Sequence, residues 1–297
     1  MGRLVLGLPS TASDSEPKLA HLGEASCAAV RADGASAGWV TVRAASVAGV
    51  RHRLAGQHCD DFYAWSLGED LIALAVADGL GSIPGSSQTA ARASRAAVTA
   101  ATGAAAAGGA GEPAVAMRAA FSAANAAAAG GGATTLVPAL VSRDGRVEVG
   151  RVGDSSAFIL RGGEASEMFP APADDVVGTE TLALPVADGG RASRRAAVQE
   201  AVFWEAAGGD LGVGDVVVLA SDGVAEPWRD GPQTVGPAMS GVVTGSPSPL
   251  ELAAAVDFSR QGCHDDRTLL CAGHDLLGTV GRSRRCETLD DLDGHPR

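Results

Sequence analysis

Acidic residues lie at the ends of several apolar runs in this sequence. They are Asp78 after LIALAVA, Asp154 after GRVEVGRVG, Asp222 after VVVLAS, the pair Asp60 and Asp61 in HCDD, and the pair Asp265 and Asp266 in CHDD. A carboxylate at a strand end is held in place by the sheet, and several carboxylates at one rim repel one another unless a cation neutralises them. Mg²⁺ and Mn²⁺ prefer such oxygen ligands. The pattern therefore indicates a site for hard divalent cations.

The Asp-Gly dipeptide is also a common turn signal, and the chain contains seven of them. Five are expected to be ordinary turns. Asp78-Gly79 and Asp222-Gly223 differ from the others because each follows a run of residues typical of a buried strand. Their order along the chain relative to the other acidic pairs also sets them apart.

The elements that must position these residues follow from the periodicity of the sequence. Strands are predicted over 39–49, 62–67, 71–77, 134–151 (a hairpin turning at Asp144-Gly145), 156–160, 215–221 and 265–273, and helices over 86–101, 112–129 and 249–262. Residues 161–195 and 226–248 are predicted to be irregular. This order does not alternate strand with helix, so it predicts an α+β fold in which an antiparallel sheet core is faced by helices.

Composition and charge narrow the class of protein. We expect residues 1–38 to be a flexible N-terminal extension, 39–275 to be one domain and 276–297 to be a charged tail.

The net charge of −12 argues against binding to nucleic acid or to an anionic membrane surface. No stretch of about 18 strongly apolar residues predicts a membrane span. Five widely spaced cysteines without a C-x-x-C favour a reducing cytoplasm. We therefore expect a cytoplasmic monomer.

Six segments, in this order, resemble the bacterial branch of the type 2C metal-dependent protein serine/threonine phosphatases. They are HRLAGQHCDDFYAW, VADGLGS, GGATTLVPAL, GRVGDSSAFIL, GDVVVLASDG and DDRTLL, and they span residues 52–270. The resemblance implies an αββα sandwich of two antiparallel sheets flanked by helices, with a binuclear Mn²⁺ or Mg²⁺ centre between the sheets. It also implies hydrolysis of phosphoserine and phosphothreonine in protein substrates by a metal-activated water, and a cognate serine/threonine kinase as a partner.

The resemblance also assigns roles to individual residues. Asp78 resembles the carboxylate that bridges both metals, and Gly79 the residue whose carbonyl binds one of them. Asp222 and Asp265 match two further metal aspartates, and Asp60 and Asp61 occupy the family's Glu-Asp pair. Asp154 resembles the ligand of a third, weaker ion. Asp61, Asp78, Asp222 and Asp265 would thus carry catalysis through the metal-activated water.

The chain departs from the family pattern at the position of the arginine that grips substrate phosphate. Gly56 stands there, four residues before the acidic pair. His52, Gly56, Cys59 and Asp61 instead resemble a bacterial variant of this motif. Arg53 or His52 is the candidate to bind phosphate in place of the missing arginine.

Two alternatives remain open from the sequence. His58-Cys59 and Cys263-His264 together could imitate a four-ligand zinc site, although adjacent residues on a strand point to opposite faces. The chain could also be a non-catalytic or regulatory relative that binds phosphoproteins without efficient turnover, because the phosphate-gripping arginine is missing.

Overall fold

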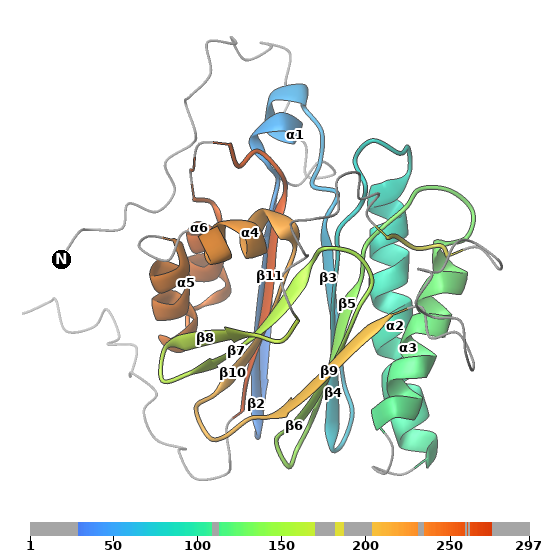
Figure 1. The fold of residues 1–297 in the computed structure, drawn as a ribbon, viewed down its shortest axis with the longest axis vertical. Coiled ribbons are helices and arrows are strands. Elements are labelled where there is room, and N and C mark those ends of the chain that lie inside the picture. The colour runs from blue at the N-terminus through green and yellow to red at the C-terminus, as the bar shows by residue number, and fades with distance from the viewer. Residues whose placement is uncertain are drawn as a thin grey trace, which may run out of the picture.

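The computed structural model describes residues 29–108, 113–169, 182–186, 204–230, 235–258, 260 and 262–274. The expected C-terminal tail, residues 276–297, and residues 1–28 of the expected extension lie outside these ranges. The described residues form two antiparallel sheets flanked by helices, which confirms the predicted fold class (Figure 1).

One sheet has six strands, in the order β1-β2-β11-β10-β7-β8. Their bounds are β1 Val30–Ala37, β2 Val40–Val47, β11 Arg267–His274, β10 Val216–Ala220, β7 Ser156–Arg161 and β8 Glu164–Glu167. Every neighbouring pair is antiparallel. The two central strands β10 and β11 are buried along almost their whole length, as their apolar runs predict.

The other sheet has five strands, in the order β3-β4-β5-β6-β9. Their bounds are β3 Phe62–Leu67, β4 Leu71–Ala77, β5 Val137–Ser142, β6 Arg146–Arg151 and β9 Glu205–Asp210. The β3–β4 connection over residues 68–70 and the β5–β6 turn at Asp144-Gly145 lie where the sequence predicts them. The short connections keep consecutive strands antiparallel.

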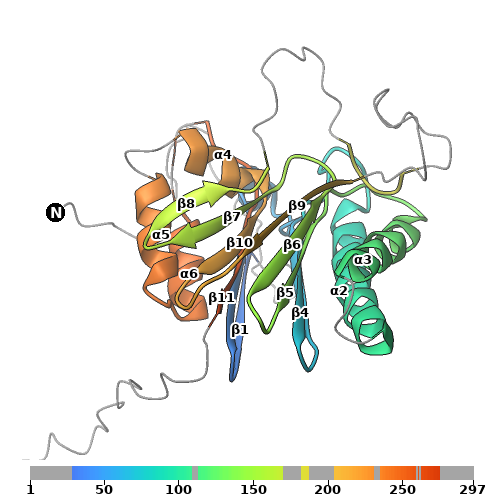
Figure 2. The ribbon, with the colours of Figure 1, turned by 60° about the horizontal axis from the view of Figure 1, so that its bottom comes forward.

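Each sheet has one face on a shared core and the other face under helices (Figures 1 and 2). The helices are α1 Val50–Ala55, α2 Ser86–Gly108, α3 Pro113–Ala128, α4 Asp222–Asp230, α5 Val235–Thr244 and α6 Pro249–Val256. Side chains such as Val76, Val149 and Leu219 fill the space between the sheets. The α2–α3 pair covers the five-stranded sheet, and α4, α5 and α6 cover the six-stranded sheet. The alanine-rich faces of α2 and α3 allow close approach to the sheet.

Several elements differ from the sequence-based expectation, and one of them is β8, a strand within residues 161–195, which were predicted to be irregular. Strand β1 lies inside the segment expected to be a flexible extension; its sequence, VRADGASA, lacks apolar alternation because it is a largely exposed edge strand. Helix α5 and the second half of α4 lie within residues 226–248, which were predicted to be irregular. Pro227 within α4 and the Gly and Pro residues of α5 lower the helix propensity of both segments, so the sequence did not predict them as helices. They form because their apolar faces pack on the sheet.

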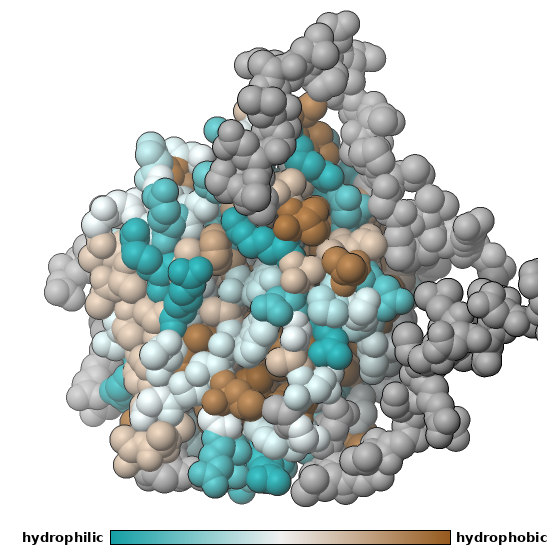
Figure 3. All heavy atoms as spheres, turned by 180° about the vertical axis from the view of Figure 1, so that it is seen from behind, coloured by the Kyte–Doolittle hydropathy of each residue, from teal (hydrophilic) through white to brown (hydrophobic). Residues whose placement is uncertain are grey.

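Strongly apolar residues are limited in extent along the described helices and on the face of the molecule seen in Figure 3. No helix among the described residues has both the length and the apolar character needed to cross a membrane. On the face seen in Figure 3, the hydrophobic residues lie in small groups between hydrophilic ones. Scattered apolar residues of this kind are normal for a protein surface.

Helix α4 begins against the backbone that leads into β11, and Gly223 makes this contact possible. A Cβ atom at Gly223 would lie 2.0 Å from the carbonyl oxygen of Asp266. We expect Gly223→Ala to lower the melting temperature, because overpacking against backbone costs about 1–3 kcal/mol. Gly241→Ala in α5 is the matched control: a Cβ there meets nothing within 4 Å. This variant should melt at or above the wild-type temperature, because alanine is the better helix former.

Thermal unfolding of the three proteins checks this expectation. A Gly223→Ala variant as stable as Gly241→Ala would show that the contact between α4 and the Asp266 backbone is looser than the structure has it.

Candidate metal centre

The β3–β4 hairpin brings Asp61 and Asp78 together. Phe62, the first residue of β3, pairs with Ala77, the last residue of β4. Asp61 immediately precedes β3 and Asp78 immediately follows β4, so the antiparallel register places the two aspartates side by side at one end of the five-stranded sheet.

The β10–β11 pair supplies acidic residues from the opposite sheet. The Ser221 N–H donates to the Thr268 carbonyl at 3.0 Å, and the Thr268 N–H donates to Ser221 Oγ at 2.9 Å. These bonds extend the strand pairing by one residue beyond the end of β10. Asp222 therefore begins α4 at the same end of the sandwich as the loop that carries Asp265 and Asp266.

Three carboxylates converge at this end of the sandwich. Asp78, Asp154 and Asp222 each offer an oxygen that lies within 4.8 Å of the other two. Asp154 lies in the short link between β6 and β7 and thus joins the cluster from the connection between the two sheets. All three side chains are half-buried. The structure thus brings together three of the sequence-predicted metal residues.

Asp61 lies next to this group and is completely buried. No well-formed hydrogen bond reaches either of its carboxylate oxygens from the described residues, although Ser221 and Asp78 lie near enough to lower its pKa by hydrogen bonding. Burial, followed by the charges of Asp266 and Asp222, raises the pKa of Asp61 to about 8. Burial likewise raises the pKa of Asp222 to about 6, with further contributions from the charges of Asp154 and Asp265. The pKa of Asp78 is raised by burial and by the charges of Asp61 and Asp222.

Two threonines fix the backbone of Asp78. Thr135 Oγ1 accepts from the Asp78 N–H at 3.2 Å, and the Asp78 carbonyl accepts from the Thr135 N–H and from Thr134 Oγ1, both at 2.8 Å. Thr135 Oγ1 also lies 2.9 Å from Ser155 Oγ, next to Asp154. The GGATT segment therefore positions two of the clustered aspartates.

The other predicted ligands lie around the cluster rather than in it. The Asp60 carboxylate faces His52 Nε2 at 3.8 Å and His58 Nε2 at 3.9 Å. Gly79 is buried, and a Cβ there would lie 2.8 Å from the Asp60 carbonyl oxygen. Asp265 is exposed, but its charge raises the pKa of Asp222, so it is close enough to act on the cluster.

Asp266 has a role that sequence reasoning did not identify. Its carboxylate accepts hydrogen bonds from the Gly49 N–H at 2.7 Å and the Asp60 N–H at 2.5 Å, and lies 2.9 Å from His52 Nδ1. Burial alone would raise the pKa of Asp266, but the bonds from His52, Gly49 and Asp60 lower it. The bond to Asp266 in turn raises the pKa of His52. The only sequence signal for Asp266 was its place beside Asp265 in the acidic pair of CHDD.

Both predicted phosphate-binding side chains are held by carboxylates. His52 contacts Asp266, and Arg53 Nη2 lies 2.8 Å from Asp257 Oδ1. Gly56 ends helix α1 with φ 67°, a left-handed conformation that favours glycine. An arginine at position 56 would therefore strain this helix end.

The alternative of a zinc site is not supported by the described residues. Within the described ranges, the group of three converging ligand atoms consists of aspartates and includes none of His58, Cys59, Cys263 or His264.

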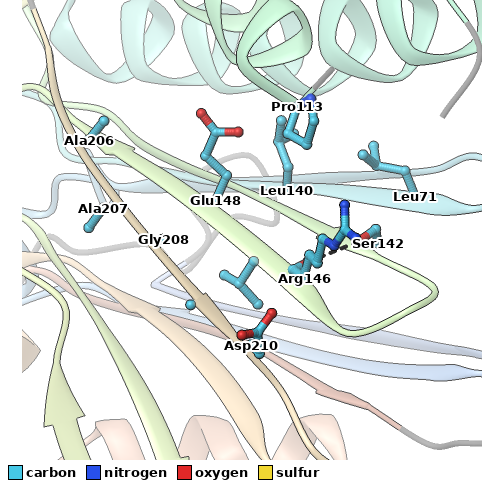
Figure 4. Close-up of a pocket in the computed structure, with 12 residues that line it drawn as sticks. Leu71, Pro113, Leu140, Ser142, Arg146, Glu148, Ala206, Ala207, Gly208 and Asp210 are labelled. Atoms are coloured by element: carbon cyan, nitrogen blue, oxygen red, sulfur yellow. Dashed lines mark hydrogen bonds between the residues drawn. The ribbon is translucent and has the colours of Figure 1, made fainter. Parts of the chain in front are cut away.

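A cavity of about 480 Å³ lies beside β6 and β9, with Leu71, Pro113 and Glu148 in its lining (Figure 4). None of the clustered aspartates lines this cavity.

The residues at the cluster fit hard divalent cations. Carboxylate oxygens are the preferred ligands of Mg²⁺ and Mn²⁺, and no well-formed hydrogen bond from the described residues offsets a charge on the buried oxygens of Asp61. The described residues place no lysine or arginine in an ion pair with Asp61, Asp78 or Asp222. Bound cations would supply the missing positive charge.

Comparison with known proteins defines the class. Residues 48–244 match the family of protein phosphatase 2C, and the chain therefore belongs to that family. No curated protein matches the sequence.

Solved structures share the fold. The catalytic domain of the serine/threonine protein phosphatase PstP in complex with two manganese ions is 20% identical and matches 80% of this chain and 99% of its own, with a TM-score of 0.50. The Ser-Thr phosphatase MsPP from Mycobacterium smegmatis in complex with cacodylate is 18% identical and matches 80% and 100%, with a TM-score of 0.53. RsbX in complex with magnesium is 12% identical and matches 82% and 100%, with a TM-score of 0.51. Family membership supports metal-dependent phosphatase activity.

The pKa of Asp61 leads to a prediction for the metal-free protein. Because the folded-state pKa, about 8, lies above the ordinary value of 3.8, the folded protein binds this proton more tightly than the unfolded chain. Ionisation of Asp61 therefore lowers the free energy of unfolding, by an amount that grows as the pH rises from about 4 to about 8. Asp61→Asn has no such charge, so its melting temperature in EDTA should exceed that of the wild type by a margin that grows with pH.

Thermal unfolding of both proteins in EDTA at about pH 5 and about pH 8.5 measures this margin. An equal margin at both pH values would mean that Asp61 ionises in the folded protein as easily as in water.

Proposed function

We propose that the protein hydrolyses phosphoserine and phosphothreonine in protein substrates at the acidic cluster, with two Mn²⁺ or Mg²⁺ ions as cofactors. The observation that carries this proposal is the group of Asp78, Asp154 and Asp222 beside the fully buried Asp61 in a chain of the phosphatase 2C family. When bound, such ions supply charge stabilisation for phosphoryl transfer and acidify water.

The chain's own residues would divide the work as follows. Asp61, Asp78, Asp222 and Asp265 would hold the two ions, with Asp60 and the Gly79 carbonyl completing the set. Asp154 would hold a third, weaker ion. Phosphoryl transfer needs chiefly positioning and charge stabilisation from the protein. Thr134 and Thr135, which fix the Asp78 backbone, and the Ser221–Thr268 bonds beside Asp222 would keep the ligands in place.

One observation favours a second candidate function, a phosphatase-like protein that binds phosphoproteins without turnover. Arg53 and His52, the side chains that could replace the missing arginine, are engaged by Asp257 and Asp266. A weak grip on phosphate would reduce turnover, so a direct assay has to separate the two functions.

Turnover of p-nitrophenyl phosphate with Mn²⁺ and with EDTA makes this test. We expect Mn²⁺-dependent turnover by the wild type, and a loss of at least ~100-fold in kcat for Asp78→Asn and for Asp222→Asn, because metal-assisted charge stabilisation is worth several kcal/mol. Asp144→Asn is the control, since Asp144 is exposed in the β5–β6 turn and should leave kcat unchanged.

Two results would count against the proposed activity. Turnover that is indifferent to EDTA would separate the activity from the metal, and no turnover at all in a Mn²⁺-loaded protein would favour the phosphoprotein-binding alternative.

The phosphate contact has its own test on helix α1. The Arg51 side chain is exposed and, within the part of the chain that the structure describes, makes no ion pair or hydrogen bond, whereas Arg53 is paired with Asp257. We expect Arg51→Ala to raise KM for a phosphopeptide several-fold at unchanged melting temperature. Arg53→Ala should leave KM unchanged and lower the melting temperature, because it removes the closer of the two arginines that pair with Asp257. A raised KM for Arg53→Ala alone would show that Arg53 leaves Asp257 to bind phosphate.

A further inference from the structure

A row of polar side chains crosses the six-stranded sheet at the end that carries the acidic cluster. Arg31 of β1 pairs in register with Ser46 of β2, and Ser46 pairs with Thr268 of β11. Directly paired residues in a sheet project from the same face. Ser46 and Thr268 are completely buried, and Thr268 Oγ1 donates to Ser46 Oγ at 2.8 Å.

This row contacts the segment that carries Asp61. Arg31 Nη1 donates to the Asp61 carbonyl at 3.0 Å, and Arg31 Nη2 to the Cys59 carbonyl at 3.4 Å. The guanidinium carbon lies 4.2 Å from the centroid of the Phe62 ring. Ser46 Oγ lies 3.1 Å from Cys59 Sγ. Arg31 therefore contacts residues on both sides of Asp61 as well as Asp61 itself.

The same segment is held from its other side by Asp266, which accepts from the Asp60 N–H. Helix α1 follows β2 of the six-stranded sheet, and residues 57–61 lead from α1 into β3 of the five-stranded sheet. Arg31 holds carbonyls of this crossing segment while Asp266 holds an N–H. Two charged side chains thus fix the backbone from Cys59 to Asp61.

The Asp61 carboxylate depends on this backbone. Its oxygens make no well-formed hydrogen bond among the described residues, and the weaker contacts with Ser221 and Asp78 leave the backbone to set its position. Its position follows from the backbone that Arg31 and Asp266 hold. Residues that orient metal ligands typically change metal affinity 10- to 100-fold when they are mutated.

We propose that Arg31 is a positioning residue for the metal centre: by binding the carbonyls of Cys59 and Asp61 it holds the Asp61 carboxylate against Asp78. This inference rests on the proposed role of Asp61 as a metal ligand. Arg31 lies outside residues 48–244, the part of the chain that matches the phosphatase family, in a strand that the sequence pattern did not reveal.

The test is Mn²⁺ binding to the full-length, metal-free protein, measured by titration calorimetry, together with its melting temperature in EDTA. We expect Arg31→Ala to raise the Kd for Mn²⁺ by about 10-fold. Arg31→Lys, which keeps a charge that can reach one carbonyl, should raise it less. Arg43→Ala is the matched control, because Arg43 is also half-buried and also donates to backbone carbonyls, those of Ala35, Val42 and Pro247, but does not touch residues 59–62.

Asp61→Asn distinguishes a failure of the positioning role of Arg31 from a failure of the proposed role of Asp61 as a metal ligand. If Asp61→Asn weakens Mn²⁺ binding and Arg31→Ala does not, Arg31 has no positioning role and the proposed function stands. If Asp61→Asn leaves the Kd unchanged, Asp61 is not a ligand, and both its proposed role in the metal centre and the positioning role of Arg31 are overturned. A lower melting temperature for Arg31→Ala with an unchanged Kd would assign Arg31 a structural role alone. Should Arg31→Ala fail to fold, the Kd of Arg31→Lys decides in the same way.

Discussion

Like charges enclosed between two sheets are the constraint on which this structure depends. Asp78, Asp154 and Asp222 offer oxygens within 4.8 Å of one another, and Asp61 lies beside them with no exposure to solvent. Two unit charges at such a distance repel each other by on the order of 3 kcal/mol at an effective dielectric constant of 20. The raised pKa values of Asp61, Asp78 and Asp222 express this repulsion together with the cost of burial. Protons or cations have to offset it, and the oxygen-rich donor set favours hard divalent cations.

The sandwich holds these groups together because each sheet contributes strand ends at the same place. The β3–β4 hairpin supplies Asp61 and Asp78, and the β10–β11 pair supplies Asp222 and the Asp265-Asp266 loop. Neutral hydroxyls of Thr134, Thr135 and Ser221 bind the adjoining backbone. They position the carboxylates without neutralising them, so the cluster keeps its affinity for cations.

Much of this arrangement could be predicted from the sequence, because strand patterns and acidic strand ends are local signals. The runs before Asp78 and Asp222 mark buried strands, and the resemblance of six ordered segments to a known family indicated which strand ends meet. Edge strand β1 gave no such signal, because an exposed strand needs no apolar alternation. Helix α5 was disguised by Gly236, Pro237 and Gly241, and forms because Met239 and Val243 pack on the sheet.

The partners of individual side chains were the least predictable feature. Arg53 pairs with Asp257 and His52 with Asp266, across more than 200 residues of sequence in each case. Such contacts depend on how the two sheets and α1 come together, which no local pattern encodes. For the same reason the contacts of Arg31 with Cys59 and Asp61 became visible only in the folded chain.

The most direct measurement of the central claim is anomalous X-ray diffraction from crystals of the protein grown with Mn²⁺ and from crystals treated with EDTA. We expect two strong anomalous peaks among the carboxylates of Asp61, Asp78, Asp222 and Asp265, both absent after EDTA. No anomalous peak at these carboxylates in saturating Mn²⁺ would contradict the central claim, because the acidic cluster would then be stabilised by protons and not by cations.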